Sequence, residues 1–269
     1  MFVKVDGGRV HVLTGGQTFD PSLPTVVFLH GAGMDATVWA LQTRWFAHHG
    51  YGVLALDFPG HGRSEGEPLP TVEAMADWTA RVLAACNASN AFIVGHSMGS
   101  LVALAIAARH TSRVARMALI GTALAMKVGQ ELLAAAQADS PDAFAMVNLW
   151  GHGARANLGQ AETPGFWMTG TGQRLLERSR KGALALDLNA CNNFEASRHV
   201  PAVRQPVLVL QGARDQMTPL KSAAALVFAL PNAALKHLDD AGHMLMIEEG
   251  SSVLLELAAF ARGSMHEGV

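Results

Sequence analysis

The chain has 269 residues, half of them hydrophobic, which is enough for a full globular core and argues against a disordered protein. The formal net charge of -2 and the sequence pI of about 6.6 show no basic excess, so nucleic acid and an anionic membrane surface are not expected partners. No stretch approaches the ~18 consecutive apolar residues of a membrane span.

Short apolar runs alternate with helical patterns along most of the chain. A hairpin is expected over residues 2–5 and 9–13, joined at Gly7 and Gly8. The alternation predicts an α/β protein with a mainly parallel sheet and helices on both faces. Further strands are predicted at 25–29, 52–56, 91–94, 114–120, 206–210 and 234–238, and helices at 37–48, at 72–85 and directly after residue 97.

Over residues 125–199 this alternation stops, and the sequence favours helices interrupted by glycine-rich breaks. We therefore expect a helical cap (lid) inserted into a core that comprises 1–124 and 200–269. The large apolar side chains of the insertion are expected to form mostly its own core, with some reaching a substrate cavity. Trp150 and Trp167 are the substrate contacts expected from the cap.

A serine lies between two glycines where a strand-like run meets a helix-like one, in Gly95-His-Ser-Met-Gly99. A residue on a sharp strand-to-helix turn has a strained backbone, and bulky side chains two positions away would collide. This predicts that Ser97 is a nucleophile, although the glycines alone would also suit close strand–helix packing. A second match is centred on Ser64, but prolines flank it and no strand precedes it, so Ser64 is expected in a loop.

A serine hydroxyl needs a base to take its proton, and the base works best when an acid fixes its tautomer. In a parallel sheet, active groups gather at the carboxyl ends of the strands. Asp215 follows the strand predicted to end at 210, and His243 follows the strand predicted to end at 238. The sequence therefore predicts Ser97, Asp215 and His243 as nucleophile, acid and base.

Two alternatives remain open for the acid. Asp215 also suits the N-cap of the helix expected after Pro219. Asp239 and Asp240 are rival acids, although their closeness to His243 in sequence favours a role in shaping its loop.

The negative charge of a tetrahedral intermediate needs preorganised donors, each worth roughly 3 kcal/mol of barrier. The amide of Met98, which follows the nucleophile, is one expected donor. The second is expected from the loop at 30–33, where glycines let the backbone approach a ligand. His30 and Gly31 in this loop are further expected substrate contacts.

The same loop also fits a dinucleotide-binding fingerprint, because residues 31–36 read G-x-G-x-x-A and Asp57 ends the next strand. That interpretation leaves the predicted triad without a role. No H-E-x-x-H pattern or closely spaced ligand pair is present, so neither a metal nor a cofactor is expected.

Cys86 and Cys191 show no paired spacing, which favours free thiols in a reducing compartment. The first residues lack a charged segment followed by an apolar one. We therefore expect a cytoplasmic monomer or homodimer that acts on a small molecule.

Taken together, the chain resembles the α/β-hydrolase superfamily along nearly its whole length. The resemblance implies an eight-stranded, mostly parallel sheet, a lid formed by the insertion, and an oxyanion hole made by the amides of Ala32 and Met98. The motifs that carry it, in family order, are His30-Gly-Ala-Gly33, Asp57-Phe-Pro-Gly-His-Gly-Arg-Ser64, Gly95-His-Ser-Met-Gly99, Gly212-Ala-Arg-Asp215 and Ala241-Gly-His243.

Within that superfamily, haloalkane dehalogenases and epoxide hydrolases use an aspartate nucleophile, and dienelactone hydrolases use cysteine, so Ser97 disfavours all three. Many carbon–carbon hydrolases carry asparagine where this chain has His96. The resemblance therefore implies a serine hydrolase of a small carboxylic ester, lactone or thioester that acts through an acyl-enzyme. The alternatives are a carbon–carbon bond hydrolase of ring-fission diketones and a non-catalytic small-molecule receptor on the same fold.

Overall fold

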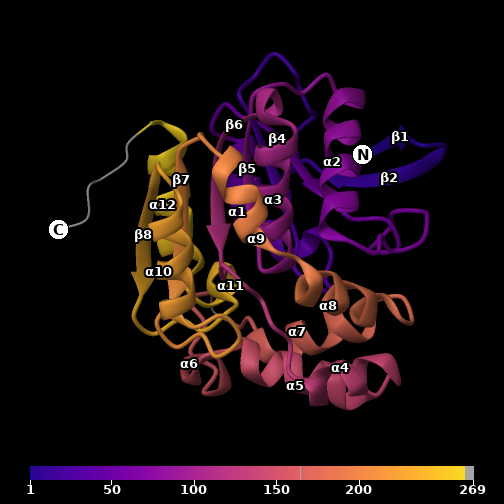
Figure 1. Cartoon of the computed structure of the whole chain (residues 1–269), viewed down its shortest axis with the longest axis vertical. Helices are drawn as coiled ribbons and strands as arrows, with labels where there is room; N and C mark the ends of the chain where they lie inside the picture. The colour runs from indigo at the N-terminus through magenta and orange to yellow at the C-terminus, as the bar shows by residue number, and fades with distance from the viewer. Residues whose placement is uncertain (164, 264–269) are drawn as a thin grey trace.

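The computed structural model describes residues 1–163 and 165–263, and a single twisted sheet of eight strands runs through its centre (Figure 1). The strand order is β1-β2-β4-β3-β5-β6-β7-β8. Strand β2 pairs antiparallel with both of its neighbours, β1 and β4, and β3 to β8 are all parallel to one another. This confirms the predicted fold class. The strands are β1 Phe2–Val5, β2 Gly8–Leu13, β3 Thr25–Leu29, β4 Gly52–Leu56, β5 Ala91–His96, β6 Val114–Ile120, β7 Val207–Gly212 and β8 Ala233–Leu238.

The N-terminal hairpin turns tightly at Asp6 and Gly7, whose φ angles are 52° and 83°. Two successive residues with positive φ match the twist of the flanking strands, which is why aspartate and glycine suit this turn. Val5 pairs with Gly8 across the turn, so β2 begins one residue before the predicted strand.

Helices cover both faces of the sheet, as predicted (Figure 1). The predicted helix at 72–85 is confirmed as α2, and its N-cap Thr71 accepts a hydrogen bond from the Ala74 amide at 3.1 Å. The predicted helix at 37–48 is divided instead into a 3₁₀ turn, capped by Asp35, and α1. The helices outside the segment between β6 and β7 are η1 Ala36–Trp39, α1 Ala40–Ala47, α2 Val72–Ala85, α3 Met98–Arg109, η2 Thr111–Arg113, α10 Leu220–Ala229, α11 Leu245–Glu248 and α12 Gly250–Ala261.

The apolar core has two halves, one on each face of the sheet. Successive side chains of a strand point to opposite faces, so Val27 and Leu29 of β3 pack with α2 and α3. Val26 and Phe28 of the same strand pack on the other face with α1 and α12. Both faces are therefore buried, which explains the nearly continuous apolar runs of the central strands.

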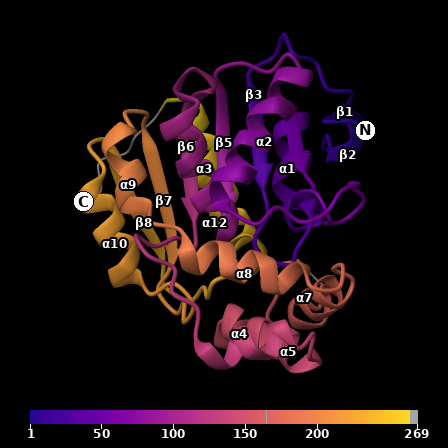
Figure 2. The same ribbon diagram turned by 45° about the vertical axis from the view of Figure 1, so that its right-hand side comes forward.

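The chain between β6 and β7 forms only helices and loops in its described part, and these helices gather beyond the carboxyl ends of the parallel strands (Figures 1 and 2). We call helices α4 to α8 the inserted helices. Figure 2 shows α8 lying between the sheet and the pair α4 and α5. The helices of this segment are α4 Gln130–Gln137, α5 Pro141–Gly151, α6 Ala154–Asn157, α7 Met168–Glu177, α8 Ala183–Asn193, α9 Ala196–His199 and η3 Val200–Ala202.

A search of the described residues for a helix that could cross a membrane finds none of sufficient length and hydropathy.

Candidate active site

Ser97 occupies the turn between β5 and α3, with φ 52° and ψ -118°. A non-glycine residue with positive φ is uncommon and marks a strained turn. A Cβ atom added to Gly95 would lie 2.1 Å from the carbonyl oxygen of Gly99, and one added to Gly99 would lie 2.3 Å from that of Leu29. The glycines therefore serve close packing, and this packing holds the serine turn in its strained form.

Ser97 opens into a cavity of about 210 Å³ between the sheet and the inserted helices. Ala32, Thr218 and His243 share the wall near Ser97, whereas the inserted helices supply a mainly apolar wall. The apolar residues that line the cavity are Met34, Met126, Val128, Leu132, Val147, Trp150, Leu184, Leu188, Cys191, Met217 and Met244.

His243 and Asp215 form a buried pair beside this cavity, with 2.8 Å between His243 Nδ1 and Asp215 Oδ2. A carboxylate only accepts, so Nδ1 carries a proton and Nε2 of the neutral ring is left with a lone pair. Within the described residues, Nε2 is buried and has no hydrogen-bond partner. The arrangement leaves one basic nitrogen unused in a site that also contains Ser97.

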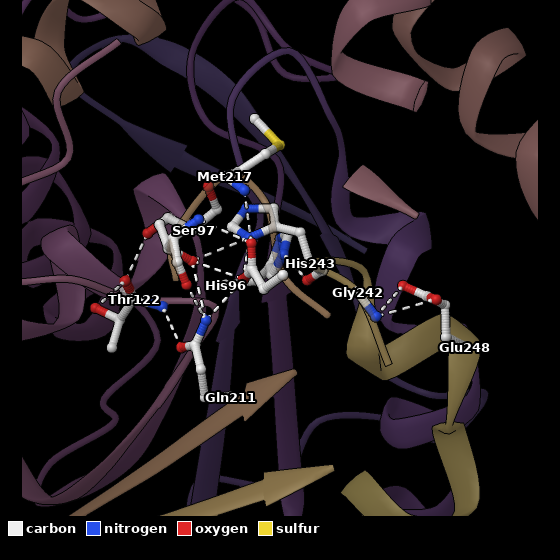
Figure 3. Close-up of polar contacts among 11 residues, drawn as sticks. His96, Ser97, Thr122, Gln211, Met217, Gly242, His243 and Glu248 are labelled. Carbon is white, nitrogen blue, oxygen red and sulfur yellow. Dashed lines mark hydrogen bonds and ion pairs between the residues drawn. The ribbon is translucent and has the colours of Figure 1, made fainter. Parts of the chain in front are cut away.

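Asp215 is held by donors on both carboxylate oxygens. Its Oδ1 accepts the amides of Met217 and Thr218, each at 2.8 Å. Its Oδ2 accepts Nε2 of Gln211 and the hydroxyl of Thr218, each at 2.7 Å, and Oε1 of Gln211 accepts the Thr122 amide (Figure 3). These contacts orient the carboxylate toward the histidine.

The electrostatics of the pair keep Asp215 ionised. Burial alone would raise the pKa of its carboxyl, but the electrostatic interaction with His243 and hydrogen bonds from His243 and Thr218 together lower that pKa below its ordinary value. The rival acids lie elsewhere, because Asp239 is exposed and pairs with His237 at 3.3 Å, and Asp240 is exposed.

The backbone around His243 is fixed by two further side chains (Figure 3). Nε2 of His96 donates to the His243 carbonyl oxygen at 3.0 Å, and burial, followed by the nearby His243, lowers the pKa of His96 to about 3. Both carboxylate oxygens of the buried Glu248 accept the Gly242 amide, and one also accepts the Gly153 amide at 2.8 Å. Glu248 thus ties the histidine loop to the start of α6.

The loop at 30–33 lies directly against the serine turn. A Cβ atom on Gly31 would be 2.9 Å from Nδ1 of His96 and 3.3 Å from Cβ of Ser97, so only glycine fits there. His30, predicted as a substrate contact, is fully buried and is not among the residues that line the cavity. Its Nδ1 donates to the Gly31 carbonyl and its Nε2 accepts the Phe58 amide, so the side chain shapes the loop instead.

The two predicted tryptophan contacts have different positions. Trp150 lines the cavity that contains Ser97. Trp167 is 71% exposed and lines a separate cavity of about 490 Å³ near Val38 and Leu41. Trp150 lies in α5 and Trp167 directly precedes α7, so a large apolar side chain of this segment can face either cavity, and the local sequence does not distinguish the two.

Ser64 lies in a loop, as predicted. Its hydroxyl donates to the Asp57 carbonyl at 2.8 Å and accepts the His11 amide at 2.8 Å. The Asp57 carboxylate accepts the amides of Ala36 and Arg63 and contacts His11 Nδ1 at 2.7 Å. Its oxygens hold the core loops together, so the acid required by the dinucleotide interpretation is occupied by the protein itself.

No group of three or more histidine, cysteine, aspartate or glutamate side chains suited to a metal occurs in the part of the chain that the structure describes. Cys86 and Cys191 are both buried and free.

Sequence reasoning missed Gln211, Thr218 and Glu248. Thr218 follows Asp215 by three residues, a spacing typical of a side chain that hydrogen-bonds within a turn, and this signal could have been found. Gln211 and Glu248 each bond to a group nearby in the sequence and to one far away, the amides of Thr122 and Gly153, and these distant contacts leave no local pattern.

Comparisons with known proteins place these features in context. A family model described as alpha/beta hydrolase fold matches residues 24–250. A pimeloyl-[acyl-carrier protein] methyl ester esterase of Aromatoleum aromaticum is 32% identical over 257 residues, which cover 87% of this chain and 97% of that protein. A 2-hydroxy-6-oxononadienedioate/2-hydroxy-6-oxononatrienedioate hydrolase of Burkholderia vietnamiensis is 29% identical over 237 residues, covering 81% and 80% of the two chains.

Among solved structures, the enol-lactonase of Burkholderia xenovorans LB400 superposes with a TM-score of 0.86 over 97% of this chain and 100% of that one. The two sequences are 24% identical, so this likeness concerns the fold.

Proposed function

Because this chain belongs to the alpha/beta hydrolase fold family, whose members among its relatives include ester-cleaving enzymes, we propose that it is a serine hydrolase. Its substrate is a small carboxylic ester, lactone or thioester, and the reaction proceeds through an acyl-enzyme. The observation that carries the proposal is the hydrogen-bonded His243–Asp215 pair, whose free Nε2 shares one cavity with the strained Ser97.

In this mechanism Nε2 of His243 takes the proton of Ser97 as the hydroxyl attacks the carbonyl carbon. Asp215 holds the ring in the tautomer with the proton on Nδ1 and stabilises the imidazolium that forms. The imidazolium then protonates the leaving group, and the neutral ring activates the water that releases the acid. The lowered pKa of Asp215 keeps its negative charge available throughout this cycle.

The oxyanion is stabilised by the amides of Met98 and Ala32. Met98 is the first residue of α3, where backbone N–H groups have no partner within the helix and the helix dipole favours negative charge. Ala32 lines the cavity next to Ser97, and the Gly31 contact holds its loop against the serine turn.

The inserted helices act as a lid over the core of 1–124 and 200–269, with 125–199 as the lid segment. The apolar wall that they contribute favours a mainly aliphatic acyl group, because contact with this wall removes apolar surface of both the substrate and the protein from water. The small cavity favours short to medium chains. The name of the 32% identical relative, a methyl ester esterase, supports ester cleavage.

A chain-length series of p-nitrophenyl esters, from acetate to decanoate, tests this proposal. The Ser97→Ala variant is expected to lose at least about 10³-fold of kcat on every ester, since it lacks the nucleophile. The control is Ser251→Ala, an exposed serine in α12, which should keep the wild-type rates. Wild-type rates in the Ser97→Ala variant would overturn the proposal.

Carbon–carbon bond hydrolysis of ring-fission diketones is a second candidate, favoured by the 29% identical Burkholderia vietnamiensis relative named for such a substrate. Measuring ester and diketone turnover on one preparation separates the two reactions. A receptor role would show instead as binding without turnover. The cytoplasmic location and the monomeric or homodimeric state stay predictions.

A further inference from the structure

A buried ion pair links inserted helix α8 to two loops of the core. Oδ2 of Asp187, from α8, accepts the backbone N–H of Gly33 at 2.8 Å and lies 2.9 Å from Nε2 of His61. The side chains of His61 and Asp187 are 1% and 0% exposed. The pair therefore joins α8, the loop at 30–33 and the loop after β4 at a point that is closed to solvent.

The surroundings of His61 require a charged ring. Its Nδ1 faces the Pro59 carbonyl oxygen at 3.0 Å, and its Nε2 faces Asp187, so both ring nitrogens meet groups that only accept. A neutral imidazole has one N–H and would set a lone pair against one of these oxygens, whereas the imidazolium donates to both. Burial opposes that charge, but the nearby Asp187 and its hydrogen bond raise the pKa of His61 above its ordinary value.

The other titratable groups that face His61 are consistent with one local cation. The ring of His30 lies 5.1 Å away, and its pKa is lowered to about 4 by burial and then by His61, so His30 is neutral. The Asp57 charge adds to the elevation of the His61 pKa. His61 is therefore the positive partner of Asp187.

Gly33 is adjacent to Ala32, whose amide is a proposed oxyanion donor. Gly33 has φ +66°, and a Cβ atom there would lie 3.0 Å from Cδ1 of Leu184 on α8, so the loop is packed against the same helix that bonds to it. Leu184, Leu188 and Cys191 of α8 also line the cavity around Ser97. One helix therefore contacts both the substrate cavity and the oxyanion loop.

We propose that Asp187 is a positioning residue, which fixes the loop carrying the Ala32 amide when α8 is seated on the core by the Asp187–His61 pair. The inference rests on the proposed function, because it requires Ala32 as an oxyanion donor. A substrate that fills the cavity against α8 would thereby favour the seated helix and the ordered oxyanion hole together. Substrate binding and transition-state stabilisation are coupled in this way.

Steady-state kinetics of Asp187→Ala, Asp187→Asn and His61→Gln on p-nitrophenyl butyrate test the coupling. Asp187→Ala is expected to lower kcat by about 10- to 100-fold with a smaller rise in KM, because a misplaced donor affects the transition state most and a less firmly held α8 weakens substrate binding. Asp187→Asn should recover part of kcat, since its amide oxygen still accepts the Gly33 N–H. The matched control is Glu177→Gln, a carboxylate of an inserted helix in the exposed pair with Arg174, which should leave kcat unchanged.

The pH dependence gives a second readout. The pKa of His61 is higher in the folded protein than its ordinary value of 6.5, which applies to the unfolded chain. The stability that protonated His61 contributes is therefore fully present below pH 6.5 and is lost as the pH rises through the pKa of the folded protein. The Tm advantage of the wild type over His61→Gln should therefore be largest near pH 6 and shrink toward pH 9. A constant Tm difference over this range would overturn the charged pair.

Hydrogen exchange separates this inference from the proposed function, because it needs no turnover. Peptides covering 30–36 and 183–193 should exchange faster in Asp187→Ala than in the wild type or in Glu177→Gln. Unchanged exchange, or a lower Tm with wild-type kcat, would overturn the positioning role. Activity retained by Ser97→Ala would instead refute the serine mechanism and leave the exchange result standing.

Discussion

Replacing Asp215 by asparagine changes the acceptor that sets the tautomer of His243. Asparagine can place its carbonyl oxygen where Oδ1 accepts the amides of Met217 and Thr218, and its NH₂ then replaces Oδ2. That NH₂ faces Nδ1 of His243 at the present 2.8 Å, so the ring must turn Nδ1 into an acceptor and carry its proton on Nε2. The opposite amide orientation sets the NH₂ against two backbone donors instead.

A ring with its proton on Nε2 cannot take the proton of Ser97. The expected loss is about 10⁴-fold in kcat, which corresponds to about 5.5 kcal/mol of activation free energy at 1.36 kcal/mol per tenfold change. The new NH₂ loses the contacts that Oδ2 makes with Gln211 Nε2 and the Thr218 hydroxyl, but the fold should survive, because the substitution keeps the shape of the side chain and the two backbone contacts to its oxygen. Thermal unfolding monitored by circular dichroism checks that the variant is folded.

Initial rates on p-nitrophenyl butyrate at neutral pH provide the assay. Asp240→Asn is the matched control, since Asp240 is an exposed aspartate close to His243 in the sequence. It should keep the wild-type rate. A folded Asp215→Asn variant within tenfold of the wild type, or an equal loss in Asp240→Asn, would refute the assignment of Asp215.

Three further predictions concern stability. Gly99→Ala should lower the free energy of unfolding in urea by about 3 kcal/mol or more, because the new Cβ would lie 2.3 Å from the Leu29 carbonyl oxygen, whereas Gly129→Ala, with nothing within 4 Å, should cost little. An equal effect at both glycines would contradict the packing argument. Ser64→Ala should lose about 1–3 kcal/mol of stability through its two buried hydrogen bonds but keep wild-type kcat, and a large loss of kcat in the folded variant would show that Ser64 has a catalytic part. Because the pKa of Asp215 is lowered from 3.8, the stability that it contributes is present above that pH and is lost as the pH falls through the lower folded value. The difference in unfolding free energy between the wild type and Asp215→Asn should therefore shrink below about pH 4, and a difference that grows there would contradict the sign of the shift.

The sheet and the serine turn were predictable because their signals are local. Residues 26–29 and 53–56 are apolar without interruption, as is typical of strands covered on both faces, and the structure has the predicted strands at 25–29 and 52–56 with these bounds. The predicted helix at 72–85 begins after Thr71, whose hydroxyl is an N-cap. Gly95 and Gly99 mark a turn where neighbouring backbone atoms lie too close to leave room for a side chain at either position.

The supports of the site were not predictable in the same way. Glu248 and Asp187 are charged residues on helices, which usually face solvent, and each accepts amides that lie 95 or 154 positions away in the chain. Only the packed fold brings these groups together. Trp167 shows the same limit, because its apolar character does not reveal that it faces the second cavity.

Covalent labelling of Ser97 tests the central claim most directly. The intact protein treated with a fluorophosphonate should gain the mass of one adduct, which peptide mapping places on Ser97. Ser97→Ala should gain none, and His243→Ala should react at least about 100-fold more slowly, since Nε2 of His243 activates the hydroxyl. A folded wild-type chain that is not labelled, or that is labelled at another serine, would contradict the proposed hydrolase mechanism.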